Sequence, residues 1–244
     1  MSSSGFPGVI ISLAKSFTVK DFQKKGFYMV KKTVTVFLIL MSLFMVSCAS
    51  SRQVTIDNPY PDFLADMPPF DLEQPSFYAK LFTKLKLYRA QKLAMIPRRN
   101  RVELYYRSGA NAYCIIMPQH ARQTIIDATL KFAEEWDEKK LVVQKATAKN
   151  AYGVSLVDLW FGVTGPINGA EDVPMYVNYL FVDGKPYLVL RFPTKLCKDS
   201  HDLYTPYEEI YLTREQAEKL CTIIDQSALE ALVEERQEKN IYEY

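Results

Sequence analysis

The sequence has few of the residues from which active sites are usually built. It contains only two histidines in 244 residues, His120 and His201, and neither belongs to a recognisable metal-ligand spacing. There is no Gly-x-Ser-x-Gly turn, no glycine-rich phosphate-binding loop and no HExxH segment. Asp199, His201 and Asp202 share one loop and are suitable metal ligands, but no further partner can be named. We therefore interpret this loop as solvated, and predict no metal, no cofactor and no catalytic residue.

Cysteine is also scarce, with four in the chain. Once Cys48 is set apart for the reason given below, Cys114, Cys197 and Cys221 remain, so at most one disulfide can form. Cys221 falls on the apolar face of an expected helix and is the natural candidate for a buried, inert thiol. No histidine or acid stands at a recognisable distance from these three cysteines, so a cysteine nucleophile is not predicted.

The one long apolar run, from Val34 to Val46, is too short for a typical membrane span of about 20 residues. Lys31 and Lys32 precede it, and the small residues Ser47-Cys48-Ala49-Ser50-Ser51 follow it. A positive patch, an apolar segment of roughly 7–15 residues and a small-residue break are the parts of a secretory signal. A plain membrane anchor and soluble secretion are the alternatives.

The break itself resembles the lipidation site of a bacterial lipoprotein. The resemblance covers residues 29–51 only: Ser47 is the usual small residue before the cysteine, while Met45 stands where leucine is usual. It implies export, cleavage before Cys48 and membrane attachment through acyl chains such as palmitate on Cys48. The expected location is the cell envelope, on its periplasmic side or at the cell surface. We also expect the true start to be Met29, which gives a compact Met-Val-Lys-Lys opening.

Charge supports a division at Cys48. The leader, residues 1–47, holds six lysines and one acid, Asp21, so the remainder has 24 basic and 27 acidic side chains and a net charge of −3. A basic domain is expected of a general nucleic-acid-binding protein. Nucleic acid is therefore not a predicted partner.

After the leader, the composition predicts a tether over 48–76 and one domain over 77–244. The tether is inferred from five prolines and five acids between 57 and 75, because closely spaced prolines disfavour helix and remove donors from a sheet. Its apolar side chains, among them Phe63 and Phe70, leave open whether it is free or lies against the domain.

Within the domain, apolar spacing of three and four residues predicts a helix over Phe77–Met95 that carries a basic face. That face, with Arg98, Arg99 and Arg101 after it, could meet anionic headgroups or simply be solvated. A second helix of about 20 residues is expected after Pro118, with Trp136 packed against a sheet.

Period-two alternation predicts the strands. They are expected at 102–106, 113–117, 155–163, 176–182, 187–192 and 210–212. Asp183-Gly184 predicts a type I′ hairpin turn. Thr213 and Gln216 form a capping box that opens a long C-terminal helix ending near Lys239. The predicted fold is α+β: an antiparallel sheet of about five to six strands, helices on one face, and a long C-terminal helix.

Tyrosine is the residue class in excess, with 16 in the chain. It is common both in strands and at contact surfaces. Tyr176, Tyr187 and Tyr211 are the predicted binding residues. Residues 208–244 hold ten acids and four bases, opposite in sign to residues 80–101, so the two regions could pair with each other or face a partner.

The function predicted first is a membrane-tethered envelope lipoprotein with a non-catalytic binding or structural domain that meets an envelope protein. The alternatives are a carrier of a lipid or small apolar ligand between sheet and helix, and an envelope enzyme of unknown reaction. An enzyme would need Asp199, His201 and another acid to converge in a cleft.

Overall fold

The computed structural model describes residues 62–81 and 83–242. The chain divides into two compact units, Met1–Gln53 and Val54–Tyr244, and the described residues lie in the second. Cys48 and the signal segment therefore lie outside the described residues. No α-helix among the described residues has the length and apolar character needed to cross a membrane.

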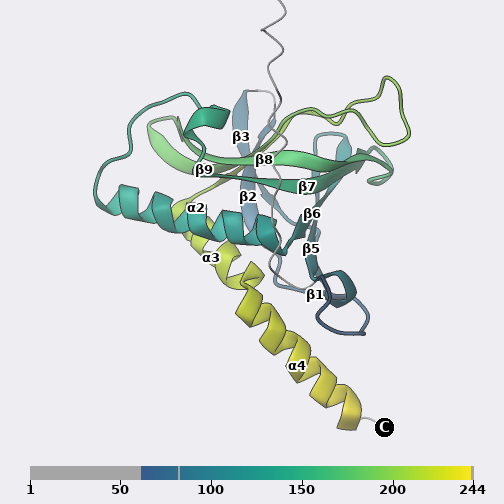
Figure 1. Ribbon diagram of the computed structural model, residues 1–244. Coiled ribbons are helices and arrows are strands. Elements are labelled where there is room, and N and C mark those ends of the chain that lie inside the picture. The colour runs from purple at the N-terminus through teal and green to yellow at the C-terminus, as the bar shows by residue number, and fades with distance from the viewer. Residues whose placement is uncertain (1–61, 82, 243–244) are drawn as a thin grey trace, which may run out of the picture. The chain divides into compact units, whose positions relative to one another are not determined.

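The described residues form a sheet of ten strands in the order β1-β4-β5-β6-β7-β8-β9-β10-β2-β3, and every pairing is antiparallel (Figure 1). The strands are β1 (Phe70–Asp71), β2 (Ser76–Leu81), β3 (Lys84–Arg89), β4 (Lys92–Ile96), β5 (Arg101–Ser108), β6 (Asn111–Pro118), β7 (Gly153–Gly162), β8 (Asn168–Val182), β9 (Lys185–Phe192) and β10 (Glu208–Leu212). The prediction of five to six strands is therefore wrong, although helix and antiparallel sheet do combine as expected.

The largest error concerns residues 77–95, where β2, β3 and most of β4 replace the predicted helix. On β2, Phe77 and Ala79 are 1% and 0% exposed while Ser76 and Lys80 face solvent, which is the alternation of a half-buried strand. β3 ends the sheet, and its exposed Lys84 fits the tendency of edge strands to carry lysine. The basic residues therefore belong to strands and do not form a helical face.

The sheet curls strongly. β3 ends at Arg89 and β4 begins at Lys92, so the last strand of the sheet and the second are joined by a link that reaches at most about 11 Å. The Gln91 N–H donates to the Tyr105 carbonyl at 2.8 Å. The rings of Phe77 on β2 and Tyr106 on β5 have centroids 5.1 Å apart, although six steps of the strand order separate β2 from β5. One face of the sheet thereby becomes an inner face.

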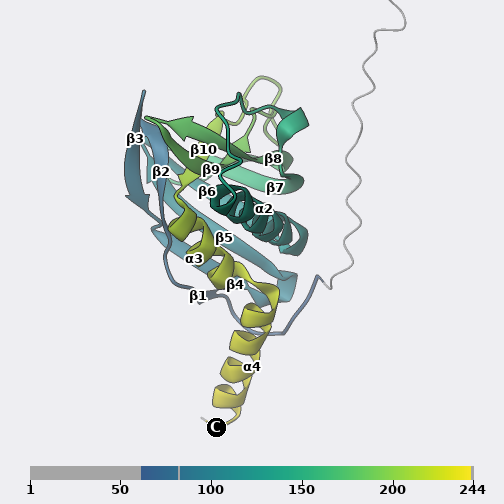
Figure 2. The same cartoon turned by 90° about the vertical axis from the view of Figure 1, so that its left-hand side faces the viewer.

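The expected helix after Pro118 is confirmed as α2 (Gln119–Asp137), which packs on β6, β7 and β8. Figure 2 shows α2 and α3 on the same face of the sheet. Ile125 and Phe132 are both 0% exposed on the buried side of α2. Contrary to the prediction, Trp136 is not in the core between α2 and the sheet: it is 37% exposed and meets the Phe132 ring edge-on at 5.7 Å.

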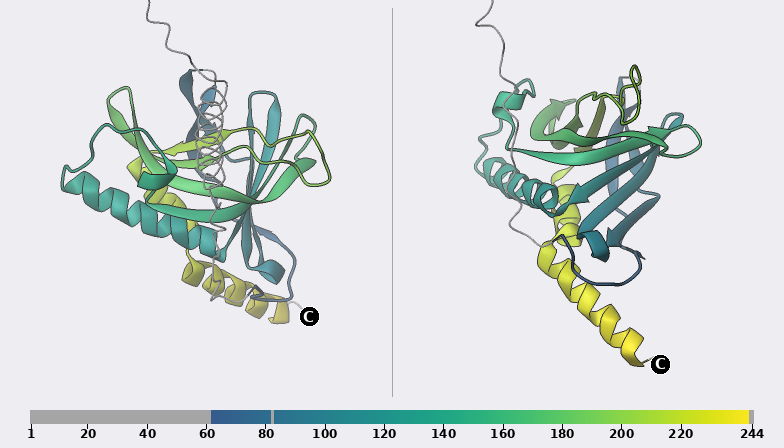
Figure 3. Two further views of the ribbon diagram at one scale, coloured as in Figure 1. Left: turned by 45° about the horizontal axis from the view of Figure 1, so that its top comes forward. Right: turned by 45° about the vertical axis from the view of Figure 1, so that its right-hand side comes forward.

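The predicted single C-terminal helix is two helices, α3 (Arg214–Ile224) and α4 (Gln226–Tyr242). The capping box of Thr213 and Gln216 is confirmed at the start of α3. Asp225 has an extended backbone, with ψ 137°, and its carboxylate accepts from the Ala228 N–H at 3.0 Å. Asp225 therefore ends α3 and caps α4. Val233 is the last buried residue of α4, and Arg236 still lies over the Phe70 ring of β1 at 4.3 Å. The C-terminal end of α4 projects from the sheet, as both views of Figure 3 show.

The expected hairpins at Asp183-Gly184 and between 102–106 and 113–117 are confirmed. Asp183 and Gly184 have φ of 50° and 74° between β8 and β9, the positive values that a type I′ turn requires. β5 and β6 pair from Arg101↔Pro118 to Ser108↔Asn111.

The described residues before β2 lie against the sheet. Ala65 and Met67 are buried, the Leu64 N–H donates to the Pro97 carbonyl at 2.9 Å, and the Leu72 N–H donates to the Leu93 carbonyl at 2.7 Å. Residues 62–76 thus pack as part of the domain, while the tether prediction for 48–61 stays a prediction.

Arg122 on α2 is 1% exposed and joins three parts of the fold. It donates to the Asn100 side-chain oxygen at 2.7 Å, to the Ile224 carbonyl at 3.1 Å and to the Gln226 side-chain oxygen at 2.7 Å. Burial lowers its pKa to about 10, so the guanidinium remains charged at neutral pH. Its partners are carbonyl and amide oxygens, which hold α2 to the α3–α4 junction.

Candidate functional site

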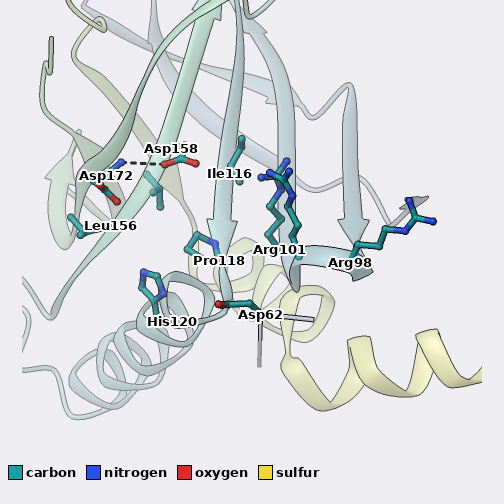
Figure 4. Close-up of a pocket in the computed structure, with 11 residues that line it drawn as sticks. Asp62, Arg98, Arg101, Ile116, Pro118, His120, Leu156, Asp158 and Asp172 are labelled. Atoms are coloured by element: carbon teal, nitrogen blue, oxygen red, sulfur yellow. Dashed lines mark hydrogen bonds between the residues drawn. The ribbon is translucent and has the colours of Figure 1, made fainter. Parts of the chain in front are cut away.

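The outer face of β5–β8 carries a groove made of two neighbouring hollows of about 540 and 450 Å³. The groove follows from strand alternation: the side chains of 102, 104 and 106 point inward, so those of 101, 103 and 105 point outward. Figure 4 shows the first hollow. Both hollows are lined by Arg99, Arg101, Ile116 and Asp158.

One side of the groove is cationic. The 3₁₀ turn η1 (Pro97–Arg99) carries Arg98 and Arg99, and β5 begins with Arg101. Arg98 pairs with Asp66 at 2.6 Å, and Arg101 pairs with Glu103 at 2.7 Å. Arg99 is exposed and forms no ion pair with any residue that the structure describes. It is therefore the cation of the groove that remains available to a ligand.

The opposite side is acidic and is built by a β-bulge. The register between β7 and β8 shifts between Val157 and Leu159, so that two residues of β8, Glu171 and Asp172, lie opposite Asp158. The Asp158 carboxylate accepts from the Asp172 N–H at 3.1 Å, and Asp172 has a left-handed φ of 54°. Burial raises the pKa of Asp158. The bulge thus directs two carboxyl groups toward the groove.

The floor between these sides is apolar, with Ile116 and Pro118 of β6 and Leu156 of β7. His120 closes one end at the start of α2, as Figure 4 shows. Burial lowers the pKa of His120, an effect that the Leu156 backbone and the carboxylate of Asp172 partly oppose. His120 is therefore neutral at neutral pH.

The second hollow contains the thiol of Cys114. Burial raises the pKa of Cys114 to about 12, so it is a thiol and not a nucleophilic thiolate at neutral pH. The Tyr105 hydroxyl donates to Glu103 at 2.7 Å, and burial together with this contact raises the pKa of Tyr105. Trp160 adds an aromatic wall.

A second carboxyl group of note lies on the inner face. Glu208 of β10 is 9% exposed and lies near Tyr106 and Tyr113, whose stacked rings have centroids 5.0 Å apart. Burial raises the pKa of Glu208 to about 7, and the two tyrosine hydroxyls offset only part of this effect.

The next residue, Glu209, points to the outer face. It accepts from the Tyr207 hydroxyl at 2.5 Å, from Lys80 at 3.0 Å and from the Tyr211 hydroxyl, and Arg191 lies 3.4 Å away. Burial alone would raise its pKa, but these donors outweigh burial and lower it. Adjacent residues of one strand thus have pKa values shifted in opposite directions.

The predicted binding tyrosines lie on the outer faces of β8, β9 and β10, away from the groove. Tyr187 and Tyr211 meet at 6.3 Å with their rings edge to face, whereas Tyr176 makes no ring contact with either within the described part of the chain. Tyr211 is 0% exposed, so its ring is part of the packing. Their role in binding stays a prediction.

The loop that carries Asp199, His201 and Asp202 is exposed, and the described residues contain no cluster of three His, Cys, Asp or Glu side chains fit to hold a metal. Cys114, Cys197 and Cys221 are free thiols.

The residues that define the groove were mostly missed by sequence reasoning. The sequence predicts Arg98, Arg99 and Arg101 as a basic run that follows a helix over 77–95, but that segment forms β2, β3 and most of β4. Asp158 and Asp172 carry no local signal, because only the bulge brings them together.

Comparison with known proteins gives a family and few functional clues. A family described as "uncharacterised Treponema protein" matches residues 67–231. An uncharacterized protein of Treponema pallidum (strain Nichols) is 21% identical over 193 residues, which cover 78% of this chain and 67% of that protein. Among solved structures, the complement regulator acquiring outer surface protein BbCRASP-4 or ErpC of Borrelia burgdorferi aligns with 66% of this chain and 100% of its own, at 12% identity. Its TM-score is 0.31, and a likeness this weak carries no argument. Because the family match spans more than half of the sequence, the chain belongs to the family of uncharacterised Treponema proteins.

Proposed function

We propose that this protein is a lipoprotein of the cell envelope, attached to a membrane through acyl chains on Cys48, and that its folded domain is a non-catalytic binding module. The anchor rests on the sequence of residues 29–51. The binding role rests on the outer groove, where charged, aromatic and apolar side chains converge around hollows large enough for a small ligand.

The chemistry of the groove favours binding over catalysis. Cys114 is held as a thiol, and His120 is held neutral. A nucleophile would need a partner that removes its proton. Among the described residues, no hydrogen bond joins His120 to a serine, threonine or cysteine of the groove.

The carrier alternative finds no specific support. Such a protein needs an apolar cavity between sheet and helix. The side chains that face each other there, Ile125 and Phe132 of α2 and Leu159 of β7, are all 0% exposed and belong to one core.

The anchor is tested by labelling cells with an alkyne analogue of palmitate. The native chain and Cys221→Ser should incorporate the label and enter the detergent phase on Triton X-114 partition, whereas Cys48→Ser should do neither. Equal labelling of Cys48→Ser would refute the anchor. The mass of the mature protein would also show whether it begins at Cys48.

The envelope partner is tested by crosslinking in intact cells and affinity capture of the acylated chain. Tyr187→Ala removes a half-buried ring of the predicted contact surface, and Tyr204→Ala, in the exposed loop after β9, is the matched control. A partner that depends on Tyr187 but not on Tyr204 supports the proposal. Equal recovery of the partner with both variants would exclude the surface around Tyr187 as its contact site.

A further inference from the structure

Opposite charges line the groove on the two sides of an apolar floor, and Asp62 lies at the His120 end of the same hollow. Figure 4 shows Arg98 and Arg101 on one side of Ile116 and Pro118, and Asp158 on the other. Although both signs line one hollow of about 540 Å³, no ion pair joins Arg98, Arg99 or Arg101 to Asp158 or Asp172 in the described part of the chain.

Strand order and an ion pair keep these charges apart. Arg101 stands on β5 and Asp158 on β7, with the whole of β6 between them, so the two backbones are separated by about 10 Å. An arginine side chain is long enough to span most of this distance, but Arg101 pairs with Glu103 of its own strand at 2.7 Å. Two opposite charges that face one groove without meeting are complementary to a ligand that carries both charges.

The position of the acidic side depends on one backbone conformation. Asp172 has φ 54°, a left-handed conformation that aspartate adopts more readily than most residues other than glycine. Its N–H donates to Asp158, so the same bulge positions both carboxyl groups. Lys195 donates to the Glu171 and Asp172 carbonyls at 2.7 and 2.9 Å, and Lys198 pairs with Glu171 at 2.6 Å, but among the described residues neither lysine forms an ion pair with the carboxylate of Asp158 or Asp172.

We propose that this groove binds a small zwitterion, with its anionic group at Arg99, its ammonium at Asp158 and Asp172, and an aliphatic spacer over Ile116. An ammonium fits the acidic side better than a metal ion does, because the described residues offer no three-ligand cluster. The inference rests on the proposed binding role of the domain and names its ligand class, but it does not depend on the lipid anchor.

The test uses the full chain purified in detergent and carrying Trp136→Phe. The substitution leaves Trp160, which lines the second hollow, as the only tryptophan, so ligand binding is followed by its fluorescence. The probes are β-alanine, γ-aminobutyrate and ε-aminocaproate, compared with the single-charge halves caproate and n-hexylamine. One length of the zwitterion should bind at least tenfold more tightly than either half. Equal affinity for a zwitterion and one of its halves would overturn the proposal.

Two variants assign the ends of the ligand. Asp172→Asn tolerates the left-handed backbone and should weaken zwitterion and n-hexylamine binding about tenfold while leaving caproate unaffected. Arg99→Gln should weaken zwitterion and caproate binding and leave n-hexylamine unaffected. Asp183→Asn is the matched control, since Asp183 has φ 50° but lies at the β8–β9 turn outside the groove. Zwitterion binding unchanged in both groove variants would refute the assignment.

The same measurements separate this inference from the proposed function. Cys48→Ser should bind the zwitterion as the native chain does. If no probe binds while the native chain is lipidated and captures an envelope protein, the zwitterion site is wrong and the proposed function stands.

Discussion

The buried carboxyl group of Glu208 predicts an unusual pH dependence of stability. Its pKa is about 7 in the folded protein against an ordinary value of 4.5, because burial between β10 and the Tyr106–Tyr113 pair favours the neutral acid. Each pKa unit is worth about 1.4 kcal/mol, so the difference corresponds to about 3 kcal/mol. This is the free energy that the folded state loses when Glu208 must be ionised.

The direction follows from proton binding. Because the folded state has the higher pKa, it holds the Glu208 proton in a pH range where the unfolded chain has lost it. The contribution of Glu208 to the free energy of unfolding is fully present below pH of about 4.5. It falls as the pH rises from there to about 7, and it is lost above that. Glu208→Gln mimics the neutral acid, so above pH of about 7 the variant should be more stable than the native protein by up to about 3 kcal/mol, and near pH of about 4 the two should be equal.

The assay is urea unfolding of the native protein and Glu208→Gln at several pH values, with the difference between the two free energies of unfolding as the quantity of interest. Glu209→Gln is the matched control on the opposite face. The pKa of Glu209 is lowered, so its carboxylate stabilises the fold above the unfolded pKa and its loss should cost about 1–3 kcal/mol at neutral pH. A Glu208→Gln difference that does not vary between pH of about 4 and 8 would refute the reasoning about burial.

Three further predictions concern single side chains. Arg122→Ala should lower the free energy of unfolding by about 3–5 kcal/mol, since it leaves the Asn100 side-chain oxygen and other buried acceptors without their donor; a loss under about 1 kcal/mol in urea unfolding would contradict this. Asp225→Ala removes the cap on the Ala228 N–H and should cost about 1 kcal/mol, while Asp225→Asn, which retains an acceptor, should cost less in the same assay. Cys114 should react with iodoacetamide in the folded protein at least about tenfold more slowly than in urea at neutral pH, because burial raises its pKa to about 12; equal rates by mass spectrometry would count against it.

The parts of the fold that sequence reasoning predicted correctly are those with a local cause. Asp183-Gly184 specifies its turn through the positive φ of two adjacent residues, and Thr213 with Gln216 specifies a helix start within four residues. Neither feature depends on what packs against it. Local chemistry was therefore sufficient to place the β8–β9 hairpin and the start of α3.

Residues 77–95 show why the rest was not predicted. β2 ends at Leu81 and β3 begins at Lys84, and the sequence between them, Phe-Thr, holds none of the usual turn residues, so nothing in the sequence interrupts the apparent helical spacing. β3 is an edge strand with partly exposed faces, which weakens its period-two pattern. The break between α3 and α4 at Asp225 was not predicted for a related reason. Apolar residues continue at helical spacing on both sides of Asp225, and only the hydrogen bond from the Ala228 N–H to its carboxylate reveals the break.

Residues 80–101 are basic and residues 208–244 are acidic, so the two regions could neutralise each other only where they meet. Within the described residues, a single ion pair joins the two regions, Lys80–Glu209 across β2 and β10. The acids of α4 lie on a helix that projects from the sheet, whereas Arg99 lies at the other end of the basic segment, beside the groove. β10 comes close to β5 across the curled sheet, but its buried acid Glu208 lies on the inner face near Tyr106, whereas Arg101 points to the outer face. In the described part of the chain, no acid of the 208–244 segment forms an ion pair with Arg99. The alternation of side chains between the two faces of the sheet, more than the charge content of the chain, therefore leaves Arg99 available to an external anion.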